Sequence, residues 1–371
     1  MLCFAEGSFG LQLTILDYMR QRVEADGPMA LSEVMKCTLT HPCFGYYATR
    51  NPLGALGDFV TAPEISQMFG ELIGLWAVVS WQQIGSPRRF NFIELGPGSG
   101  MMMNDALRAS QLVPDFHVAL DLHLVEASLA LRKIQKNSLA GYAPTWHNDV
   151  YSLPCGPSII IANEFFDAMP ITQLVRGSLG WHERRLSFDQ QTKMPIWTVM
   201  AETSHLASLL HPKVLTTGQV GEIAEVSSFS LSIADALARR LVSEGGVALV
   251  IDYGYCNSAL GDTLQAVKKH KFVDVLENLG QSDLTAHVDF AALSAAVNKA
   301  GAIAYGPITQ SAFLLSLGII QRTYNLMKKS NYKQARSIEA AMVRLIDSKA
   351  MGSLFKVSAW SGREVNLLPG L

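Results

Sequence analysis

Short apolar runs alternate with segments of helical periodicity along most of the chain. The apolar runs, which are typical of buried parallel strands, lie at 90–95, 121–126, 143–147, 158–162, 247–252 and 353–360. The segments with helical spacing lie at 101–111, 128–139, 230–243, 289–299, 310–316 and 335–349. Strands that alternate with helices predict an α/β fold, with a parallel sheet covered by helices on both faces.

The first 85 residues have a different pattern. Helical spacing at 9–25 ends at Asp26-Gly27-Pro28, a short helix follows at 29–37, and residues 40–62 are irregular. Pro63 then predicts the start of a helix that runs to about Gln83. We therefore expect an N-terminal helical cap region at 1–85 and a core domain at 86–371.

The α/β rhythm is broken near 171–220. There the sequence LVRGSLGWHERRLSFD predicts a β-hairpin with a polar turn, and IWTVM predicts a further strand. We interpret this segment as a β-rich insertion into the core domain.

Composition narrows the class of protein. The chain has a net charge of −2, and its basic runs, Lys268-Lys269-His270-Lys271 and Lys328-Lys329, are short, which disfavours nucleic-acid binding. The five cysteines are scattered without C-x-x-C spacing, so neither a zinc site nor a disulfide framework is expected. The sequence has no signal or transit peptide pattern, and its apolar segment 73–84 is too short to span a bilayer. We expect a cytoplasmic protein without membrane insertion; the sequence gives no oligomeric state.

The most informative motif is the glycine-rich stretch that follows the apolar run 90–95. Gly96, Gly98 and Gly100 form G-x-G-x-G, and Glu94 stands two residues before the first glycine. Dinucleotide-binding loops instead have G-x-G-x-x-G, and a carboxylate at this point would repel a pyrophosphate. S-adenosylmethionine (SAM) offers an ammonium and a sulfonium there and carries no phosphate. The loop therefore predicts a SAM site rather than a nicotinamide dinucleotide site.

Carboxylates recur where the predicted strands end. Glu94, Glu126, Glu164 and Asp252 occupy four such positions. Ligands of open α/β sheets bind at this edge, so the pattern indicates an acidic crevice for a cationic cofactor and a cationic substrate. Acids at loop starts also cap helices, which is the structural alternative for each of them.

Two of the polar positions suit the nucleoside. Glu126 is predicted to accept hydrogen bonds from the ribose hydroxyls, unless it caps the helix that begins near Ser128. Asp149, after the third predicted strand, is a candidate acceptor for the adenine amino group; the alternative is a side chain that only makes an Asx turn.

The loop 163–170 has the sequence NEFFDAMP. Glu164 and Asp167 are candidates to bind a guanidinium, because a carboxylate can accept two parallel hydrogen bonds from it. Phe165 and Phe166 either contact a cation through a ring face or belong to the core. Glu64, next to Pro63, is a third candidate acid, although an acid in a first helical turn also stabilises the helix dipole.

Several stretches together resemble the MidA family of SAM-dependent methyltransferases. They are GDFVTAPEISQMFGE (57–71), ELGPGSG (94–100), NEFFDAMP (163–170), DTLQAV (262–267), DLTAHVDF (283–290) and GSLFKV (352–357). The resemblance implies a class I methyltransferase fold with a seven-stranded sheet. It implies that Glu94 and the three glycines contact SAM, that Glu126 lies at the ribose, and that NEFFDAMP and the TAPE helix start border the substrate site. Members of the family include a mitochondrial protein arginine methyltransferase that assists assembly of respiratory complex I.

The sequence therefore predicts methyl transfer from SAM to a protein nitrogen, with arginine as the favoured acceptor. Glu164 is predicted to hold the guanidinium, and Asp167 and Glu64 are candidate helpers. Two alternatives stay open: an assembly factor or chaperone of this fold without catalysis, and a methyltransferase that acts on small molecules.

Overall fold

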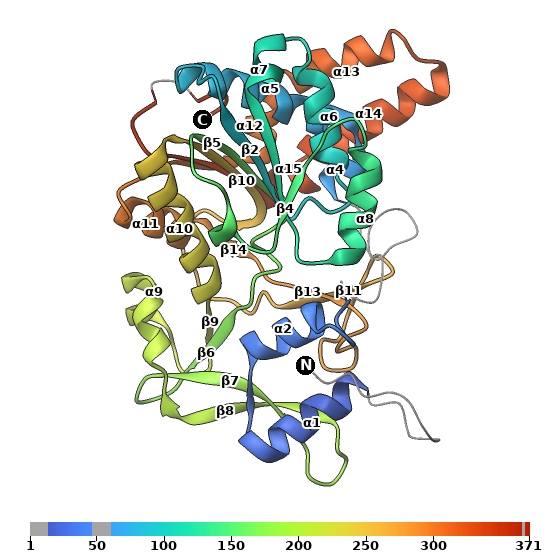
Figure 1. The fold of residues 1–371 in the computed structure, drawn as a ribbon. Coiled ribbons are helices and arrows are strands. Elements are labelled where there is room, and N and C mark those ends of the chain that lie inside the picture. Colours follow the sequence, from blue (N-terminus) through green and yellow to red (C-terminus); the bar gives the residue numbers. More distant parts are fainter. Residues whose placement is uncertain (1–13, 47–60, 366–367) are drawn as a thin grey trace. The chain divides into compact units, whose positions relative to one another are not determined.

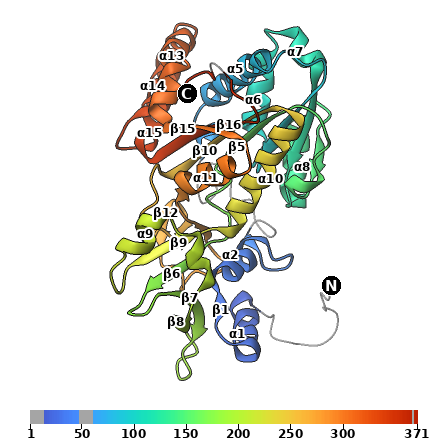
Figure 2. The ribbon, with the colours of Figure 1, turned by 90° about the vertical axis from the view of Figure 1, so that its left-hand side faces the viewer.

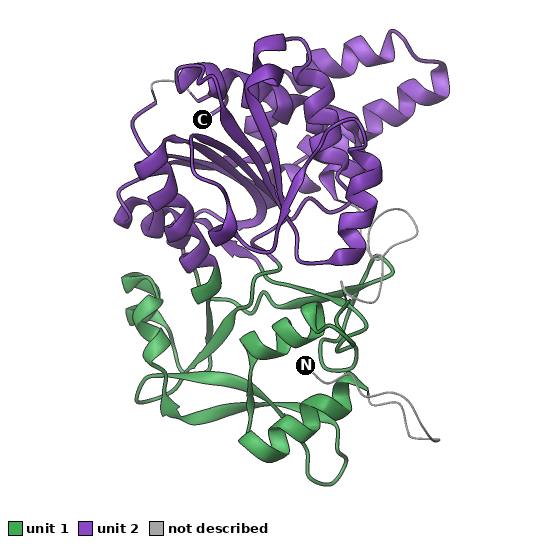
Figure 3. Cartoon of the chain, viewed as in Figure 1, with its two compact units in different colours: residues 1–59, 168–229, 259–286 green, residues 60–167, 230–258, 287–371 purple. Residues whose placement is uncertain are grey.

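The computed structural model describes residues 14–46, 61–365 and 368–371. The chain forms two compact units (Figure 3): residues 1–59, 168–229 and 259–286 make unit 1, and residues 60–167, 230–258 and 287–371 make unit 2. Most of the segment predicted to be irregular, 40–62, lies outside the described residues. No helix within the described ranges is long and apolar enough to cross a membrane.

Unit 2 is built on a mixed sheet (Figure 1). Seven strands follow the order β15-β16-β10-β5-β2-β3-β4, and a short eighth, β14, pairs with β10. The strands are β2 (Phe90–Leu95), β3 (Leu120–Val125), β4 (Thr145–His147), β5 (Ser158–Asn163), β10 (Gly246–Tyr255), β14 (Val288–Asp289), β15 (Ile303–Thr309) and β16 (Phe355–Ser361). The strands β4, β3, β2, β5 and β10 are parallel. β16 runs antiparallel to β10, and β15 pairs antiparallel with β16, so β15 has the same direction as the parallel strands. The predicted α/β fold is confirmed.

Helices cover both faces of this sheet, as a parallel sheet requires. The helices of unit 2 are α4 (Ala62–Ile65), α5 (Gln67–Gln83), α6 (Met101–Ser110), α7 (Pro114–Ala119), α8 (Leu129–Ser138), α10 (Ser228–Glu244), α11 (Phe290–Lys299), α12 (Gln310–Ser316), α13 (Ile319–Met327), α14 (Tyr332–Ile346) and α15 (Met351–Leu354), with a 3₁₀ turn, η1, at Val150–Ser152; of these, α13 and α14 extend away from the sheet (Figures 1 and 2). One face of the sheet packs alternate strand residues such as Phe92 and Ile161 against α5, α6 and α12. Helices α10 and α11 lie on the other side (Figure 2).

Helix α5 is part of the core of unit 2 and not of a separate cap. Gly70 and Gly74 are spaced four residues apart on α5 and let α6 approach very closely. A Cβ at Gly74 would lie 2.3 Å from the Ala106 carbonyl oxygen, and one at Gly70 would lie 2.8 Å from Asp105 Cβ. The units are accordingly not divided at residue 85, because α5 buries Phe69 and Trp76 among the sheet-covering residues.

The single helix predicted from Pro63 to Gln83 is wrong in one respect. It is broken at Ser66, which has extended backbone angles (φ −161°, ψ 133°). The Ser66 hydroxyl accepts a hydrogen bond from the Met68 amide at 3.2 Å and so caps α5. This break leaves α4 as a separate turn that carries Glu64.

Unit 1 combines the first helices with the predicted β-rich insertion. Its elements are α1 (Ile15–Asp26), β1 (Met29–Ala30), α2 (Leu31–Thr40), β6 (Thr172–Arg176), β7 (Trp181–Phe188), β8 (Pro195–Thr203), η2 (His205–Leu209), α9 (Pro212–Thr217), β9 (Ile223–Val226), β11 (Gln265–Lys268), β12 (Lys271–Val273) and β13 (Asp283–Thr285). The predicted hairpin is the β6–β7 pair, and β8 is the strand predicted at IWTVM. The strands β11–β13 form a small second sheet that the sequence pattern did not indicate.

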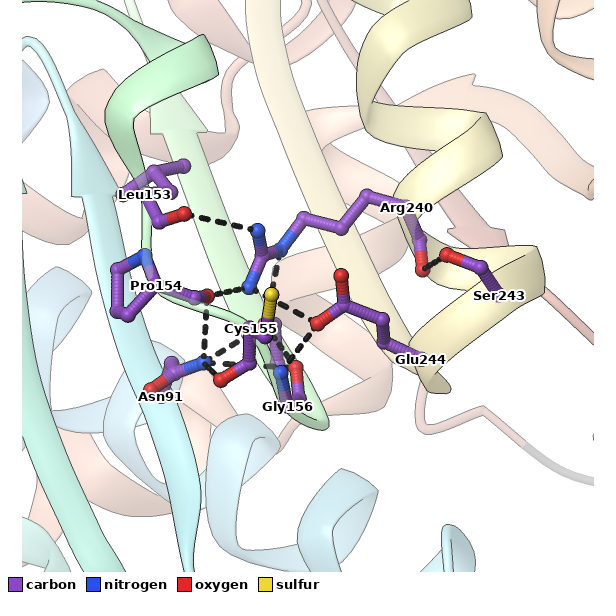
Figure 4. Close-up of polar contacts among 9 residues, drawn as sticks. Asn91, Leu153, Pro154, Cys155, Gly156, Arg240, Ser243 and Glu244 are labelled. Atoms are coloured by element: carbon purple, nitrogen blue, oxygen red, sulfur yellow. Dashed lines mark hydrogen bonds and ion pairs between the residues drawn. The ribbon is translucent and has the colours of Figure 1, made fainter.

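At the amino ends of the unit 2 strands, polar side chains clamp the loop that leads into β5 (Figure 4). The buried amide of Asn91 donates to the carbonyls of Pro154 and Cys155, both at 3.2 Å. Arg240, on α10, donates to the Pro154 carbonyl and lies 3.5 Å from Glu244, which accepts a hydrogen bond from the Gly156 amide. These bonds satisfy backbone groups that the packed strands would otherwise leave without partners.

We expect Asn91→Asp to lower the free energy of unfolding by about 3 kcal/mol, because a buried carboxylate would replace the donor that faces these carbonyls. Urea unfolding measures the change. Asn257→Asp, at an exposed turn position, is the matched control and should change stability by less than about 0.5 kcal/mol. Equal stability of the two variants would contradict the clamp.

Candidate active site at the carboxyl edge of the sheet

The register of the parallel strands places the predicted acidic positions at one edge. Leu95 pairs with Val125 on β3 and with Ala162 on β5, and Asn163 pairs with Ile251 on β10. The residues that follow these pairs therefore start neighbouring loops at the same edge, where open α/β sheets bind ligands.

The glycine loop after β2 requires its glycines. Gly96, Gly98 and Gly100 have φ angles of +63°, +53° and +79°, in the left-handed region that side chains disfavour. Gly100 is the N-cap of α6, and its own amide bonds to the Pro97 carbonyl at 2.7 Å. The chain thus turns from strand to helix within five residues and presents its backbone at the strand ends.

Gln135, on α8, fixes this loop from behind. Its Nε2 donates to the Gly98 carbonyl at 2.9 Å and to Glu126 Oε2 at 3.1 Å, and its Oε1 accepts from Trp146 Nε1 at 2.8 Å. Ser138, one helical turn further on, donates to the Ser99 carbonyl at 2.8 Å. Gln135 is fully buried. Sequence reasoning missed it, because Gln135 lies on the helix after β3 and its partner Gly98 is 37 positions away in the sequence.

Glu94 is buried at the end of β2, with 2% of its surface exposed. Its Oε2 has no hydrogen-bond partner among the described residues. Burial raises the pKa of Glu94 to about 8. A buried carboxyl oxygen without a partner among the described residues, next to the glycine loop, fits a cationic group such as the ammonium of SAM.

Glu126 and Asp149 both accept hydrogen bonds from nearby backbone amides, as the alternatives to nucleoside binding predicted. Glu126 Oε1 accepts from the Ser128 amide at 2.7 Å, and burial raises the pKa of Glu126. Asp149 Oδ1 accepts from the amides of Tyr151 and Ser152 at 3.0 and 2.9 Å and so caps η1. A carboxylate has further lone pairs, so neither contact excludes a nucleoside hydroxyl or amine.

Glu164 begins the loop after β5 in a strained conformation, with φ +49°. Its Oε1 accepts hydrogen bonds from the Ala62 amide at 3.0 Å and from Asn163 Nδ2 at 3.3 Å. Burial raises the pKa of Glu164 to about 8, and the nearby carboxylates of Asp167 and Glu64 act in the same direction. The structure therefore brings the three predicted acids together.

Asp167 and Glu64, the two further candidate acids, each make a specific hydrogen bond. Asp167 Oδ2 accepts a hydrogen bond from the Tyr253 hydroxyl. Glu64 forms a capping box, in which its carboxylate accepts from the Thr61 amide at 3.3 Å. Asp58, in the same stretch of the sequence, lies outside the described residues.

Asp252 organises the acidic loop from within the core. Its side chain is fully buried, and its Oδ2 accepts hydrogen bonds from the consecutive amides of Phe165, Phe166 and Asp167 at 3.2, 2.9 and 3.2 Å. Burial, with the carboxylates of Asp167 and Glu164 nearby, raises the pKa of Asp252 well above its ordinary value. Sequence reasoning placed Asp252 at the right edge but did not identify this role.

The two phenylalanines of the loop have different environments. Phe166 is 3% exposed and packs against Trp360 with ring centroids 6.0 Å apart, so it belongs to the core. Phe165 is partly exposed and stands over the glycine loop, because a Cβ at Gly96 would lie 3.1 Å from Phe165 Cδ2. Of the two, it is Phe165 that can present a ring face to a ligand at this edge.

Comparisons with known proteins agree on one class. Residues 72–308 match the profile of a family of S-adenosyl-L-methionine-dependent methyltransferases. The mitochondrial protein arginine methyltransferase NDUFAF7 of Danio rerio is 33% identical over 94% of this chain and 87% of its own length. The protein of the same name from Homo sapiens is 33% identical over 93% of this chain and 82% of its own length.

A solved structure extends the likeness to the fold. A crystal structure of a protein from Burkholderia thailandensis, bound to S-adenosyl-homocysteine, has a TM-score of 0.81 and 26% identity, and covers 95% of this chain and 92% of its own. The family resemblance and the expected class I fold are confirmed. The expected cytoplasmic location is contradicted, because the relatives from Danio rerio, Homo sapiens and Caenorhabditis elegans are all named mitochondrial.

The burial of Glu94 predicts a pH dependence of stability. A glutamate in the unfolded chain ionises near pH 4.5, whereas folded Glu94 ionises with a pKa of about 8. The unfolded state therefore holds fewer protons between these values, and stability falls as pH rises through this window. We expect the free energy of unfolding of Glu94→Gln to be about 2–4 kcal/mol higher than that of the wild type near pH 8 and equal to it near pH 4. Urea unfolding of the cofactor-free protein measures this difference. Glu24→Gln, at an exposed position of α1, should show no such difference; a parallel rise in both variants would contradict this account.

The glycine loop predicts a loss of cofactor affinity without loss of the fold. Gly98→Val places a β-branched side chain at φ +53° and displaces the backbone, so the Kd for S-adenosylhomocysteine should rise at least about 100-fold. Isothermal calorimetry measures the Kd, and circular dichroism checks the fold. Gly141→Val, at a turn with open space around the glycine, should alter the Kd by no more than about twofold. Retained affinity in Gly98→Val would refute the assignment of the loop.

Proposed function

We propose that this chain, which belongs to the family of S-adenosyl-L-methionine-dependent methyltransferases, transfers the methyl group of SAM to arginine side chains of a protein substrate. The proposal is carried by one observation: the carboxylates of Glu164, Asp167 and Glu64 converge beside the glycine loop, at the edge where the cofactor binds. The relatives that share about a third of the sequence are named protein arginine methyltransferases, which supports the same acceptor. Because those relatives are named mitochondrial, we propose a mitochondrial location for this protein as well.

For the cofactor, we assign binding to the backbone of Gly96, Gly98 and Gly100, to Glu94 and to Glu126. When bound, SAM supplies a methyl group that is already activated on a sulfonium. Glu94 is the group that receives the ammonium, since its buried Oε2 is a polar atom left without a partner in the described part of the chain. Asp149, whose Oδ1 caps η1, is assigned to the adenine amino group through its second oxygen.

For the substrate, Glu164 binds the guanidinium through a charge-assisted hydrogen bond. Without a cation, burial and the neighbouring acids favour the protonated form of Glu164, in line with its pKa of about 8. A guanidinium at this point favours the ionised form, so binding of the substrate and ionisation of Glu164 support each other. The ionised carboxylate draws the positive charge of the guanidinium toward the nitrogens it contacts and localises a lone pair on the nitrogen that attacks.

Asp252 and Tyr253 are positioning residues in this scheme. The three backbone hydrogen bonds to Asp252 fix the loop, and the Tyr253 hydroxyl fixes Asp167. Donor and acceptor must meet in line, and positioning of this kind supplies on the order of 7–11 kcal/mol of the barrier reduction in well-oriented reactions.

We expect Glu164→Gln to lower kcat for methyl transfer to an arginine-containing peptide by about 100-fold or more, because the amide cannot stabilise the cation as the carboxylate does. The Kd for S-adenosylhomocysteine should change by less than about threefold, since Glu164 is assigned to the substrate. Transfer of labelled methyl groups measures kcat, and calorimetry measures the Kd.

Glu277→Gln, at an exposed position, is the control and should retain full activity. A Lys-for-Arg version of the peptide tests the acceptor and should not be methylated. Unchanged turnover in Glu164→Gln would remove Glu164 from the mechanism, and binding of S-adenosylhomocysteine without transfer to any arginine substrate would favour a role in assembly over catalysis.

A further inference from the structure

The helical hairpin formed by α13 and α14 has an outer part with no buried side chain. Residues 324–344 are all described, and none of them is buried, although they include the end of α13 and most of α14. In Figures 1 and 2 this orange hairpin extends away from the central sheet of its own unit. Amphipathic helices are normally stabilised by burying an apolar stripe, so this hairpin lacks the cover that its sequence is suited to.

The base of the hairpin, in contrast, is firmly attached. Arg322 donates to both carboxylate oxygens of Glu71 on α5, at 2.6 and 2.9 Å, and Glu71 is 2% exposed. Ile319 and Leu345 are buried at the same end. The base of the hairpin is therefore held against unit 2, whereas its tip is exposed to solvent.

The tip, residues 324–336, has an unusual combination of side chains. It contains Lys328, Lys329, Lys333 and Arg336 and no acidic residue. Tyr324 is 53% exposed and Tyr332 is 82% exposed. Lys328 Nζ lies 4.3 Å from the centroid of the Tyr324 ring, so cation and aromatic ring form one surface.

The charge of the hairpin is opposite to that of the rest of the chain. Residues 319–349 contain seven basic and two acidic residues, out of 30 and 32 in the whole sequence. Everything outside the hairpin is therefore net acidic. Of the tip cations, Arg336 pairs with Glu339 at 3.6 Å, and no carboxylate lies within ion-pair distance of the three lysines in the described part of the chain.

We propose that the α13–α14 tip docks the protein on the surface of an anionic lipid bilayer. Lysines beside an anionic bilayer gain electrostatic free energy, and tyrosines prefer the headgroup region because one end of the ring is apolar and the other polar. Ile320, which is 58% exposed one turn before Tyr324, extends the apolar side of α13. The attachment needs no membrane-spanning segment and is independent of the methyl-transfer site.

The same features fit a nucleic acid less well. A phosphodiester backbone is bound by cations spread over a broad surface or groove, whereas these lysines occupy one narrow turn between two helices. Exposed aliphatic side chains such as Ile320 gain nothing from a phosphate backbone, whereas a bilayer interface accepts them.

The test uses the full chain and sedimentation with vesicles of phosphatidylcholine, with and without phosphatidylserine. We expect binding only to the anionic vesicles. Lys328→Glu with Lys329→Glu should lower the partition coefficient at least about 25-fold, at about fivefold for each lysine lost. Tyr332→Ser should lower the partition coefficient about threefold. The binding that remains should be more sensitive to salt, because the apolar contribution is lost.

Arg88→Glu with Arg89→Glu is the matched control. These two arginines are also adjacent, exposed and in unit 2, but no exposed aromatic residue lies beside them in the sequence. This double variant has the same net charge and should bind within about twofold of the wild type. Circular dichroism and methyl-transfer activity should be unchanged in all variants, which separates this proposal from the one on catalysis.

Three results would overturn the proposal. They are absence of binding to the anionic vesicles, an equal loss in the lysine and arginine double variants, and tighter binding to a duplex RNA than to vesicles with loss in the same lysine variant. The second would show attraction by net charge alone, and the third would assign the tip to nucleic acid.

Discussion

The candidate site depends on the buried carboxylate of Asp252. Three consecutive backbone amides of the loop after β5 donate to one of its oxygens, and the Tyr253 amide donates to the other at 2.9 Å. These amides would otherwise be buried without partners, at a cost of about 1–3 kcal/mol each. The same bonds sustain the left-handed backbone of Glu164, which a free loop would abandon. One acid in the core thus fixes the position of two others at the surface of the site.

The buried polar residues at the amino and carboxyl ends of β2 differ in whether their hydrogen-bonding groups have partners. At the amino end, the Asn91 amide has carbonyl partners on the neighbouring loop, and the cluster is satisfied within the chain. Three residues later, Glu94 is equally buried, yet one of its oxygens has no partner among the described residues. A satisfied buried group stabilises the fold, whereas an unsatisfied one costs free energy until a ligand completes it. The two ends of β2 therefore differ in that only the amino end, away from the candidate site, has its buried polar group satisfied within the described part of the chain.

The proposed cofactor and substrate positions both lie beside buried carboxyl groups. Glu94, Glu164 and Asp252 all have pKa values raised by burial, and they lie near the carboxyl edge of the adjacent strands β2, β5 and β10. Such a set of acids is unfavourable in an otherwise apolar sheet, and each added cation relieves part of the cost. The reaction that we propose brings two cations to this edge, an aminoacyl sulfonium and a guanidinium. Under this proposal, the electrostatic cost of bringing these acids together is also a source of selectivity for cations.

The sequence alone determined those features that depend on neighbouring residues. Continuous apolar runs specify buried strands, so β2, β3 and β5 were predicted to within one residue, whereas β10 runs three residues beyond its predicted end. The positive φ angles of Gly96, Gly98 and Gly100 follow from a turn that only glycine adopts readily. The acids at the strand ends were visible for the same reason. Where the local pattern is interrupted, prediction failed: β15 contains Gly306-Pro307, and Ser66 breaks a helix whose spacing reads as continuous.

Tertiary structure decided which polar groups meet. Gln135 bonds to Gly98, which is 37 positions away, and Asp252 bonds to amides 85–87 positions away, so no local pattern could reveal either role. It also decided that Glu126, Asp149 and Glu64 have backbone partners. The buried Oε2 of Glu94, in contrast, has no partner in the described part of the chain. The physical reason is that periodicity reports only whether a side chain faces water or core. Satisfaction of a buried hydrogen-bonding group depends on atoms brought close in space by the fold.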